Sequence, residues 1–81
     1  MGSEQVAAAV RDILGRIKRL DKPVEPDRNL IEYGYDSMNI MQLIVDLEIH
    51  FGIAFPEEQL LTSNFSTIDS IVSLIEAGLN K

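Results

Sequence analysis

Ser37 is the residue whose type and position best suit a covalent reaction at its side chain. It lies in the run Tyr33-Gly34-Tyr35-Asp36-Ser37-Met38, where a predicted loop becomes an amphipathic helix. A serine there has its hydroxyl beside unpaired backbone N–H groups and the positive end of the helix dipole, which favour a phosphate. The chain has no cysteine and one histidine, His50, so Ser37 has no evident activating base. We therefore predict that another protein modifies Ser37.

No other group of side chains in the sequence predicts catalysis. The chain lacks a metal-ligand cluster, a phosphate-gripping glycine-rich loop and a paired acid–base set. For His50, a partly buried imidazole or one facing the C-terminal end of its helix is the simpler interpretation. We expect no catalytic residue, no metal site and no enzymatic activity.

Length and composition predict one packed domain over residues 1–81. With 46% hydrophobic and 25% charged residues, the balance is that of a globular chain rather than a disordered one. The lack of cysteine suits a reducing cytoplasm and leaves packing to hold the fold. Because no apolar run approaches roughly 18–20 residues and no signal peptide is evident, we expect a cytoplasmic monomer without membrane insertion.

Charge is distributed unevenly along the chain. The net charge of −6 argues against nucleic acid as a partner. Residues 1–28 hold six basic and five acidic residues, whereas residues 29–80 hold eight acidic residues and no lysine or arginine. A surface of one sign steers basic partners and repels acidic ones, although general solubility is the alternative explanation.

Apolar periodicity predicts an all-α fold, a small bundle of three main helices plus one short helix. The first helix is expected from about Ser3, as N-cap, to Leu20, and the second from about Ser37 to Phe51, with Asp36 as N-cap and Gly52 past its end. A short helix is expected near residues 57–61 after Pro56. The last, capped by Ser66 with Asp69 three residues on, is expected to reach about Ala77. In the long connection before Asp36, we expect Leu30 and Ile31 to anchor the chain to the core.

The second predicted helix carries two apolar stripes. At 100° per residue from Ser37, one stripe lies between about 240° and 320° and should face the bundle, and it comprises Ile40, Leu43, Leu47 and Phe51. The other lies between about 40° and 120° and comprises Met38, Met41, Val45 and Ile49. A helix buried nearly all round would explain both. We favour an exposed docking surface for partner proteins, because methionine side chains repack against different partners.

These residues resemble the carrier proteins that bear a 4′-phosphopantetheine arm, which include acyl, peptidyl and D-alanyl carrier proteins. The family signature, Gly-x-Asp-Ser-Leu/Met, reads Gly34-Tyr35-Asp36-Ser37-Met38 here. The resemblance continues through Leu47-Glu48, Phe51-Gly52-Ile53 and Pro56-Glu57-Glu58, and it covers the chain from Val6 to Leu79.

The resemblance implies a covalent cofactor and several partner enzymes. A phosphopantetheinyl transferase would transfer 4′-phosphopantetheine from coenzyme A to Ser37, and Asp36 would cap the helix and be recognised by the transferase. The thiol of the arm would carry an acyl or aminoacyl thioester, loaded by a ligase or transferase and passed to a downstream synthase or acyltransferase. Partner docking is expected at Met38, Met41, Gln42, Val45, Asp46, Glu48 and Ile49.

The cargo is open on sequence alone. Fatty-acid-synthesis members carry carboxylates at the positions of Asn39, Gln42 and Ile49, which are uncharged here. This difference favours a free-standing carrier in a specialised lipid, polyketide or related pathway, with a D-alanyl, aminoacyl or peptidyl carrier as the alternative. A remoter alternative is a non-carrier helical interaction domain, in which Ser37 only caps a helix and the methionine stripe is core.

Overall fold

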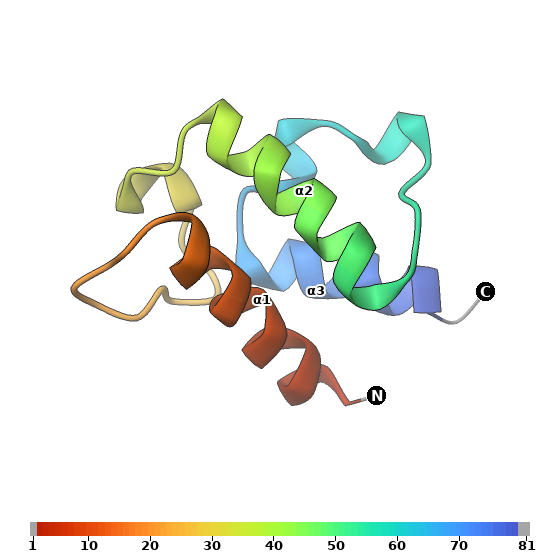
Figure 1. Ribbon diagram of the computed structural model, residues 1–81, viewed down its shortest axis with the longest axis horizontal. Helices are drawn as coiled ribbons and strands as arrows, with labels where there is room; N and C mark the ends of the chain where they lie inside the picture. The colour runs from red at the N-terminus through yellow and green to blue at the C-terminus, as the bar shows by residue number, and fades with distance from the viewer. Residues whose placement is uncertain (1, 80–81) are drawn as a thin grey trace.

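The computed structural model describes residues 2–79. It consists of three α-helices, and the connections between them contain short 3-10 turns (Figure 1). In chain order the elements are α1 (Ser3–Ile17), η1 (Leu30–Tyr33), α2 (Ser37–Phe51), η2 (Glu57–Gln59), η3 (Thr62–Phe65) and α3 (Ile68–Leu79). No β-strand occurs among the described residues. The predicted all-α bundle of three main helices is confirmed; the short helix expected near residues 57–61 is the 3-10 turn η2, and two further 3-10 turns, η1 and η3, were not predicted.

The three helices share one apolar core. α1 packs against both α2 and α3, and η3 packs against α2 and α3. Each helix contributes one stripe, and the buried residues of the helices are Val6, Val10, Ile13, Leu14, Ile40, Leu43, Ile44, Leu47, Ile68, Ile71, Val72 and Ile75. No polar or charged residue of the described chain is buried, so packing of these stripes is what holds the bundle together.

Helix α1 differs from its sequence-based prediction at both ends. Its N-cap is Gly2, and Ser3 is the first helical residue, with its hydroxyl donating to Glu76 of α3 at 2.9 Å. The helix ends at Ile17 rather than Leu20, because Lys18 has an extended backbone. The Tyr35 hydroxyl donates to the Leu14 carbonyl at 2.8 Å, which places a side chain from the next connection at this terminus.

The connection from α1 to α2 is anchored at Leu30 but not at Ile31. Leu30 is fully buried, and its N–H donates to the Ser66 carbonyl at 2.7 Å. The prediction for Ile31 was wrong, since its side chain is 71% exposed. Asn29 caps η1 and turns Leu30 inward, so the following residue faces solvent, and Tyr35 supplies the second anchor instead.

Helix α3 is capped by Thr67 rather than by Ser66. The Thr67 hydroxyl oxygen accepts the Ser70 N–H at 3.1 Å, while the Ser66 hydroxyl donates to the Ser63 carbonyl at 2.9 Å. The predicted pairing of Ser66 with Asp69 is therefore wrong. Ser66 is held by η3, so the next hydroxyl along the chain takes the capping position.

Helix α2 has the predicted bounds, with Asp36 as N-cap and Gly52 as C-cap. Gly52 has a φ of 64°, a left-handed conformation that glycine adopts without steric cost. The chain then turns back along the helix, and the Glu48 carboxylate accepts the Phe55 N–H at 2.9 Å. Of α1, α2 and α3, the helices within residues 2–79, none has both the length and the apolar character required to span a lipid bilayer.

Replacing Tyr35 with phenylalanine should lower the free energy of unfolding by about 1 kcal/mol, because the buried hydroxyl donates to the Leu14 carbonyl. Burial also raises the pKa of Tyr35. The unfolded state therefore ionises first as pH rises, and stability should fall above about pH 10, less steeply in Tyr35→Phe. Urea unfolding followed by circular dichroism measures both effects.

Tyr33→Phe is the matched control for this experiment. The Tyr33 hydroxyl accepts the N–H of Glu25, at 3.0 Å, at an exposed position, so its loss should change stability by less than about 0.5 kcal/mol. Equal losses in the two variants would show that the Tyr35 hydrogen bond does not fix the end of α1.

Candidate functional site

The N-terminus of α2 is fixed by two reciprocal hydrogen bonds. The Asp36 carboxylate accepts the Asn39 N–H at 2.9 Å, and the Asn39 side-chain oxygen accepts the Asp36 N–H at 3.0 Å. This arrangement is a capping box, which holds the first turn from both sides. It makes Ser37 the first helical residue, directly after the cap.

Ser37 presents its hydroxyl to solvent at this fixed point. The residue is exposed, and the N–H groups of Ser37 and Met38 have no acceptor within residues 2–79. The Asp36 carboxylate accepts the Asn39 N–H instead, and the Asp36 carbonyl accepts the Ile40 N–H. Unpaired N–H groups and the helix dipole together favour an anion bonded to the hydroxyl oxygen, by about 0.3–1 kcal/mol for a surface charge. The site therefore suits a serine-linked phosphate.

The approach to Ser37 is anchored by the buried Tyr35 and turned by Gly34. Tyr35 is 1% exposed, and its N–H donates to the Leu30 carbonyl at 3.2 Å. Gly34 has a φ of 91° and ends η1, a conformation that favours glycine over any other residue. The glycine of the Gly34-Tyr35-Asp36-Ser37-Met38 signature thus has a backbone role, and its tyrosine anchors the segment.

A surface pocket of about 350 Å³ opens beside Ser37. It lies between η1, the start of α2 and the segment around η3, and it is lined by Asn29, Leu30, Ile31, Tyr35, Asp36, Ser37, Ile40, Ser63 and Ser66. Its walls come from three separate parts of the chain. It was not foreseen from the sequence.

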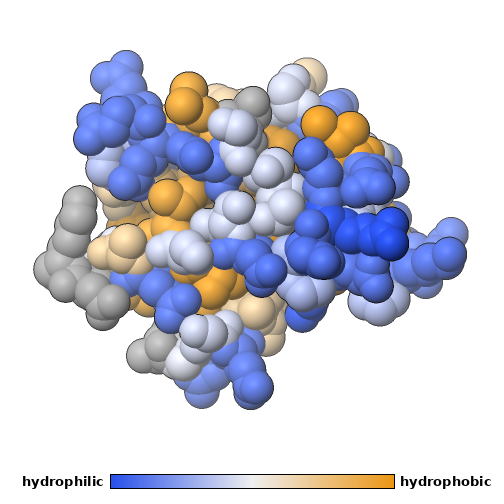
Figure 2. Space-filling model, turned by 180° about the vertical axis from the view of Figure 1, so that it is seen from behind, coloured by the Kyte–Doolittle hydropathy of each residue, from blue (hydrophilic) through white to orange (hydrophobic). Residues whose placement is uncertain are grey.

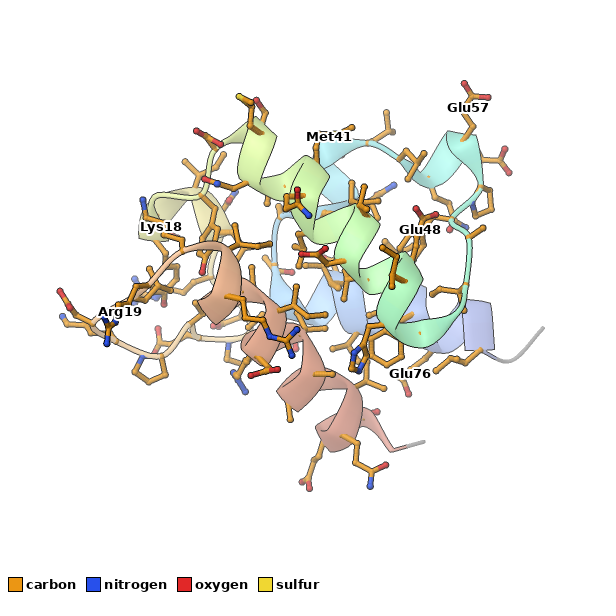
Figure 3. The ribbon with its side chains drawn as sticks, in the orientation of Figure 1. Lys18, Arg19, Met41, Glu48, Glu57 and Glu76 are labelled. Atoms are coloured by element: carbon orange, nitrogen blue, oxygen red, sulfur yellow. The ribbon has the colours of Figure 1, made fainter. Side chains whose placement is uncertain are left out.

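The second apolar stripe of α2 is exposed, so the alternative of a helix buried nearly all round is wrong. Met38 is 79% exposed and Ile49 76%, and Met41 and Val45 between them are exposed as well. In Figure 3 the labelled Met41 side chain projects away from the body of the bundle. We refer to Met38, Met41, Val45 and Ile49 as the α2 strip.

The predicted polar docking residues occupy two different environments. Gln42 donates to the Asp46 carboxylate at 2.9 Å along the helix surface, adjacent to the α2 strip. Glu48 is half-buried and its carboxylate holds the Phe55 N–H, so this side chain has a structural role at the far end of α2. Their part in docking stays a prediction.

Within the described residues, the basic side chains come only from the first part of the chain, up to Arg28. Figure 3 places Lys18 and Arg19 at one end, beside the first connection, and Glu48, Glu57 and Glu76 toward the other. The face seen in Figure 2 is mostly hydrophilic, with apolar residues in separate patches. Because residues 29–79 include no lysine or arginine, the aspartate and glutamate side chains of α2 and α3 meet no lysine or arginine on these helices.

Sequence reasoning missed three parts of the site. The Asp-x-x-Asn spacing of Asp36 and Asn39 is a signal for the capping box that could have been read. Tyr35 lay within the signature, but nothing local distinguishes it from Tyr33 as the buried tyrosine. Ser63 and Ser66 could not be placed beside Ser37, because only the tertiary fold brings η3 there.

Residues 4–75 match the family model described as "Phosphopantetheine attachment site". The match spans most of the chain and includes the capped start of α2. The chain therefore belongs to this family, and it is a carrier protein domain that bears covalent 4′-phosphopantetheine.

Two curated relatives illustrate the range of the family. The D-alanyl carrier protein of Lacticaseibacillus casei is 32% identical over 78 residues, covering 94% of this chain and 96% of that protein. A nonribosomal peptide synthetase-like enzyme of Aspergillus fumigatus is 47% identical over 52 residues, covering 64% of this chain. The chain spans only 3% of that enzyme's length.

A solved structure shares the fold. A chain in the crystal structure of an engineered Bradyrhizobium japonicum glycine:[carrier protein] ligase complexed with carrier protein from Agrobacterium tumefaciens and ATP superposes with a TM-score of 0.80. Sequence identity is 27%, and the match covers 89% of this chain and 97% of that one. A second chain, of the complex containing AMP, gives a TM-score of 0.79.

Asp36→Ala should lower the free energy of unfolding by about 1 kcal/mol, since it removes the acceptor of the Asn39 N–H. Asp36→Asn should cost much less, because an asparagine oxygen caps a helix about as well. Urea unfolding of both variants measures the difference. Equal losses would show that the negative charge of Asp36, and not its hydrogen bond, stabilises the start of α2.

Proposed function

We propose that Ser37 is the residue that carries the 4′-phosphopantetheine arm. The observation that supports this most directly is the exposed Ser37 hydroxyl at the capped start of α2, inside the region matched to the attachment-site family. The alternative in which Ser37 caps the helix conflicts with the structure, since Asp36 has that role. The methionine stripe is not core either.

The attachment is a phosphoryl transfer from coenzyme A. The Ser37 oxygen attacks the phosphorus that bears the pantetheine. The bond between this phosphorus and the bridging oxygen of the diphosphate breaks, and adenosine 3′,5′-bisphosphate leaves. The hydroxyl proton passes to a base of the transferase, which also supplies Mg²⁺. This chain contributes a nucleophile held at one position, which suits a reaction dominated by positioning and charge stabilisation.

Asp36 has two roles in this proposal. Its carboxylate caps α2, which fixes Ser37, and its remaining exposed surface is a recognition feature for the transferase. Its charge opposes the added phosphate at short range. We therefore assign Asp36 to positioning and recognition. The free N–H groups of Ser37 and Met38 are the donors that bind the phosphate.

The cargo that we favour is an aminoacyl thioester. The sequence pattern favours acyl cargo slightly, but a D-alanyl carrier protein matches over nearly the whole chain, and the fold matches a chain from a complex of an engineered glycine:[carrier protein] ligase with a carrier protein. The physical argument agrees, because the ammonium of an aminoacyl group is attracted to a surface with only acidic charges. Acyl cargo is the second candidate.

The α2 strip is the docking surface for the partner enzymes in this proposal. It is apolar, exposed and begins one residue after Ser37, so an enzyme bound there has its active site within reach of the arm. Gln42 and Asp46 provide a polar rim, and the acidic field favours partners with basic surfaces. The catalytic groups for loading and transfer belong to those enzymes.

Incubation with coenzyme A and a broad-specificity phosphopantetheinyl transferase should raise the intact mass by one phosphopantetheine group. Ser37→Ala should show no increase and should change stability by less than about 0.5 kcal/mol, because the side chain is exposed. Ser73→Ala, at an exposed serine of α3, is the control that keeps the full increase. Modification of Ser37→Ala would contradict the assignment.

Met41→Asp should reduce aminoacylation of the holo-protein by a glycine:[carrier protein] ligase about tenfold or more in kcat/KM. The reason is that a charge replaces an apolar contact at the centre of the α2 strip. Ala8→Asp adds the same charge on an exposed face of α1 and should leave kcat/KM unchanged.

Two results would count against these assignments. Equal kcat/KM for Met41→Asp and the wild type would remove the α2 strip from docking. If the holo-protein accepts fatty acids from an acyl ligase but no amino acid from ligases for glycine or D-alanine, the cargo is acyl.

A further inference from the structure

We propose that Lys18, Arg19 and Lys22 form a second docking surface, which binds acidic side chains of an enzyme seated on the α2 strip. We call these three residues the basic corner. The proposal rests on attachment at Ser37 and on the docking role of the α2 strip. The basic corner adds a contact of opposite sign to the acidic side chains of α2 and α3, and it thereby sets the orientation of the carrier on its partner.

The three cations of the basic corner are available to a partner. All three residues are exposed, and among the described residues no carboxylate lies within 4.0 Å of their side-chain nitrogens. Asp21 lies between Arg19 and Lys22 in the sequence and pairs with neither. The three other arginines have intramolecular partners: Arg16 pairs with Asp12, Arg28 with Glu25 and Glu32, and Arg11 donates to the Val24 carbonyl.

The segment that carries the basic corner is anchored at both ends. It leaves α1 after Ile17, where the Tyr35 hydroxyl donates to the Leu14 carbonyl. It returns to the core at Val24, which is 5% exposed, and Leu20 packs against the core between these points. The charges therefore project from an anchored loop, so binding them orders less of the chain than binding a free tail would.

Lys18 brings the basic corner close to the attachment site. Its Cε and Nζ atoms lie 3.0 Å from the position that a Cβ atom on Gly34 would occupy, so the ammonium lies against the bare face of this glycine. Gly34 is three residues before Ser37, a span of at most about 11 Å. A standard interface covers about 800 Å² of each partner, which is a disc of about 16 Å radius. An enzyme centred on Ser37 therefore reaches Lys18.

The surface beside Lys22 has room for an acidic side chain. Lys22 lines two hollows, of which the smaller, of about 340 Å³, is lined by two cations, Arg11 and Lys22, and one carboxylate, Asp21. The larger, of about 550 Å³, is balanced, because Lys22 and Arg28 line it together with two glutamates. The smaller hollow is therefore the one that favours a carboxylate of a partner.

The partner that fits this surface is a folded protein with charges of both signs. A nucleic acid or an anionic membrane is negative throughout, so the acidic side chains of residues 29–79 and the net charge of −6 repel it. An enzyme can present basic side chains to α2 and acidic ones to the basic corner. The reverse orientation brings like charges together on both sides of Ser37, which disfavours it.

Double neutralisation, Lys18→Gln with Lys22→Gln, should lower kcat/KM for phosphopantetheinylation of the apo-protein about fivefold at low ionic strength and leave kcat unchanged. The reason is that charges at the rim of an interface act mainly on the association rate. In about 0.5 M salt the difference should fall below about twofold, because screening shortens the reach of the charges to about 4 Å. The assay is intact mass against time with coenzyme A and a broad-specificity phosphopantetheinyl transferase.

Ala8→Glu with Ala77→Glu is the matched control. It makes the same change in net charge at exposed positions of α1 and α3 outside the basic corner, and it should not lower kcat/KM. An equal fall in both double variants would overturn the proposal, because net charge alone would then explain the loss. A loss in the neutralised variant that salt leaves unchanged would overturn it as well.

Cross-linking with a carbodiimide locates the contact directly. The reagent activates a carboxylate, a lysine amine forms an amide with it, and the carbodiimide leaves as a urea. The lysines of the chain are Lys18, Lys22 and Lys81, so Lys81 is the internal reference. We expect amides between Lys18 or Lys22 and acidic residues of the transferase. Cross-links through Lys81 alone would overturn the basic corner and leave attachment intact, whereas a wild-type mass that never rises would overturn attachment, and this proposal with it.

Discussion

The site depends on the reciprocal hydrogen bonds between Asp36 and Asn39, because they set where α2 begins. Each residue of an α-helix is turned by about 100° from the one before, so fixing Ser37 as the first helical residue fixes the direction of its side chain relative to the apolar stripes of the helix. With Ser37 as the first helical residue, Leu43 and Leu47 point inward and the α2 strip points outward. The same two bonds occupy the N–H groups of Asp36 and Asn39, so within residues 2–79 the free N–H donors of the first turn are those of Ser37 and Met38.

Helix α2 has more apolar surface than the bundle can cover. One stripe completes a core that α1 and α3 share, and no polar residue of the described chain is buried within it. The other stripe is exposed to water and lies outside the core. A sequence under selection for packing alone has no reason to keep two methionines there, which agrees with the proposed use of the strip by partner enzymes.

The features that follow from local chemistry were predictable, and those that depend on distant contacts were not. The bounds of α2 and its caps follow from Asp36, Gly52 and an unbroken apolar period. At the end of α1 the Leu14 carbonyl accepts the Tyr35 hydroxyl, and before α3 the Ser66 hydroxyl donates to Ser63 of η3, and neither contact is visible in the residues next to the helix ends. For the site, Ser37 and the strip were found from spacing, whereas the pocket needed the fold to bring η1 and η3 together.

The α2 strip lies on one helix of 15 residues, about 22 Å long, which is room for a single enzyme. In the proposed cycle, loading and receiving enzymes therefore exclude one another, and each must leave before the next can bind. Long residence on the carrier would then slow the whole sequence of reactions. Modest affinity with rapid dissociation is the kinetic regime that such a shared surface demands.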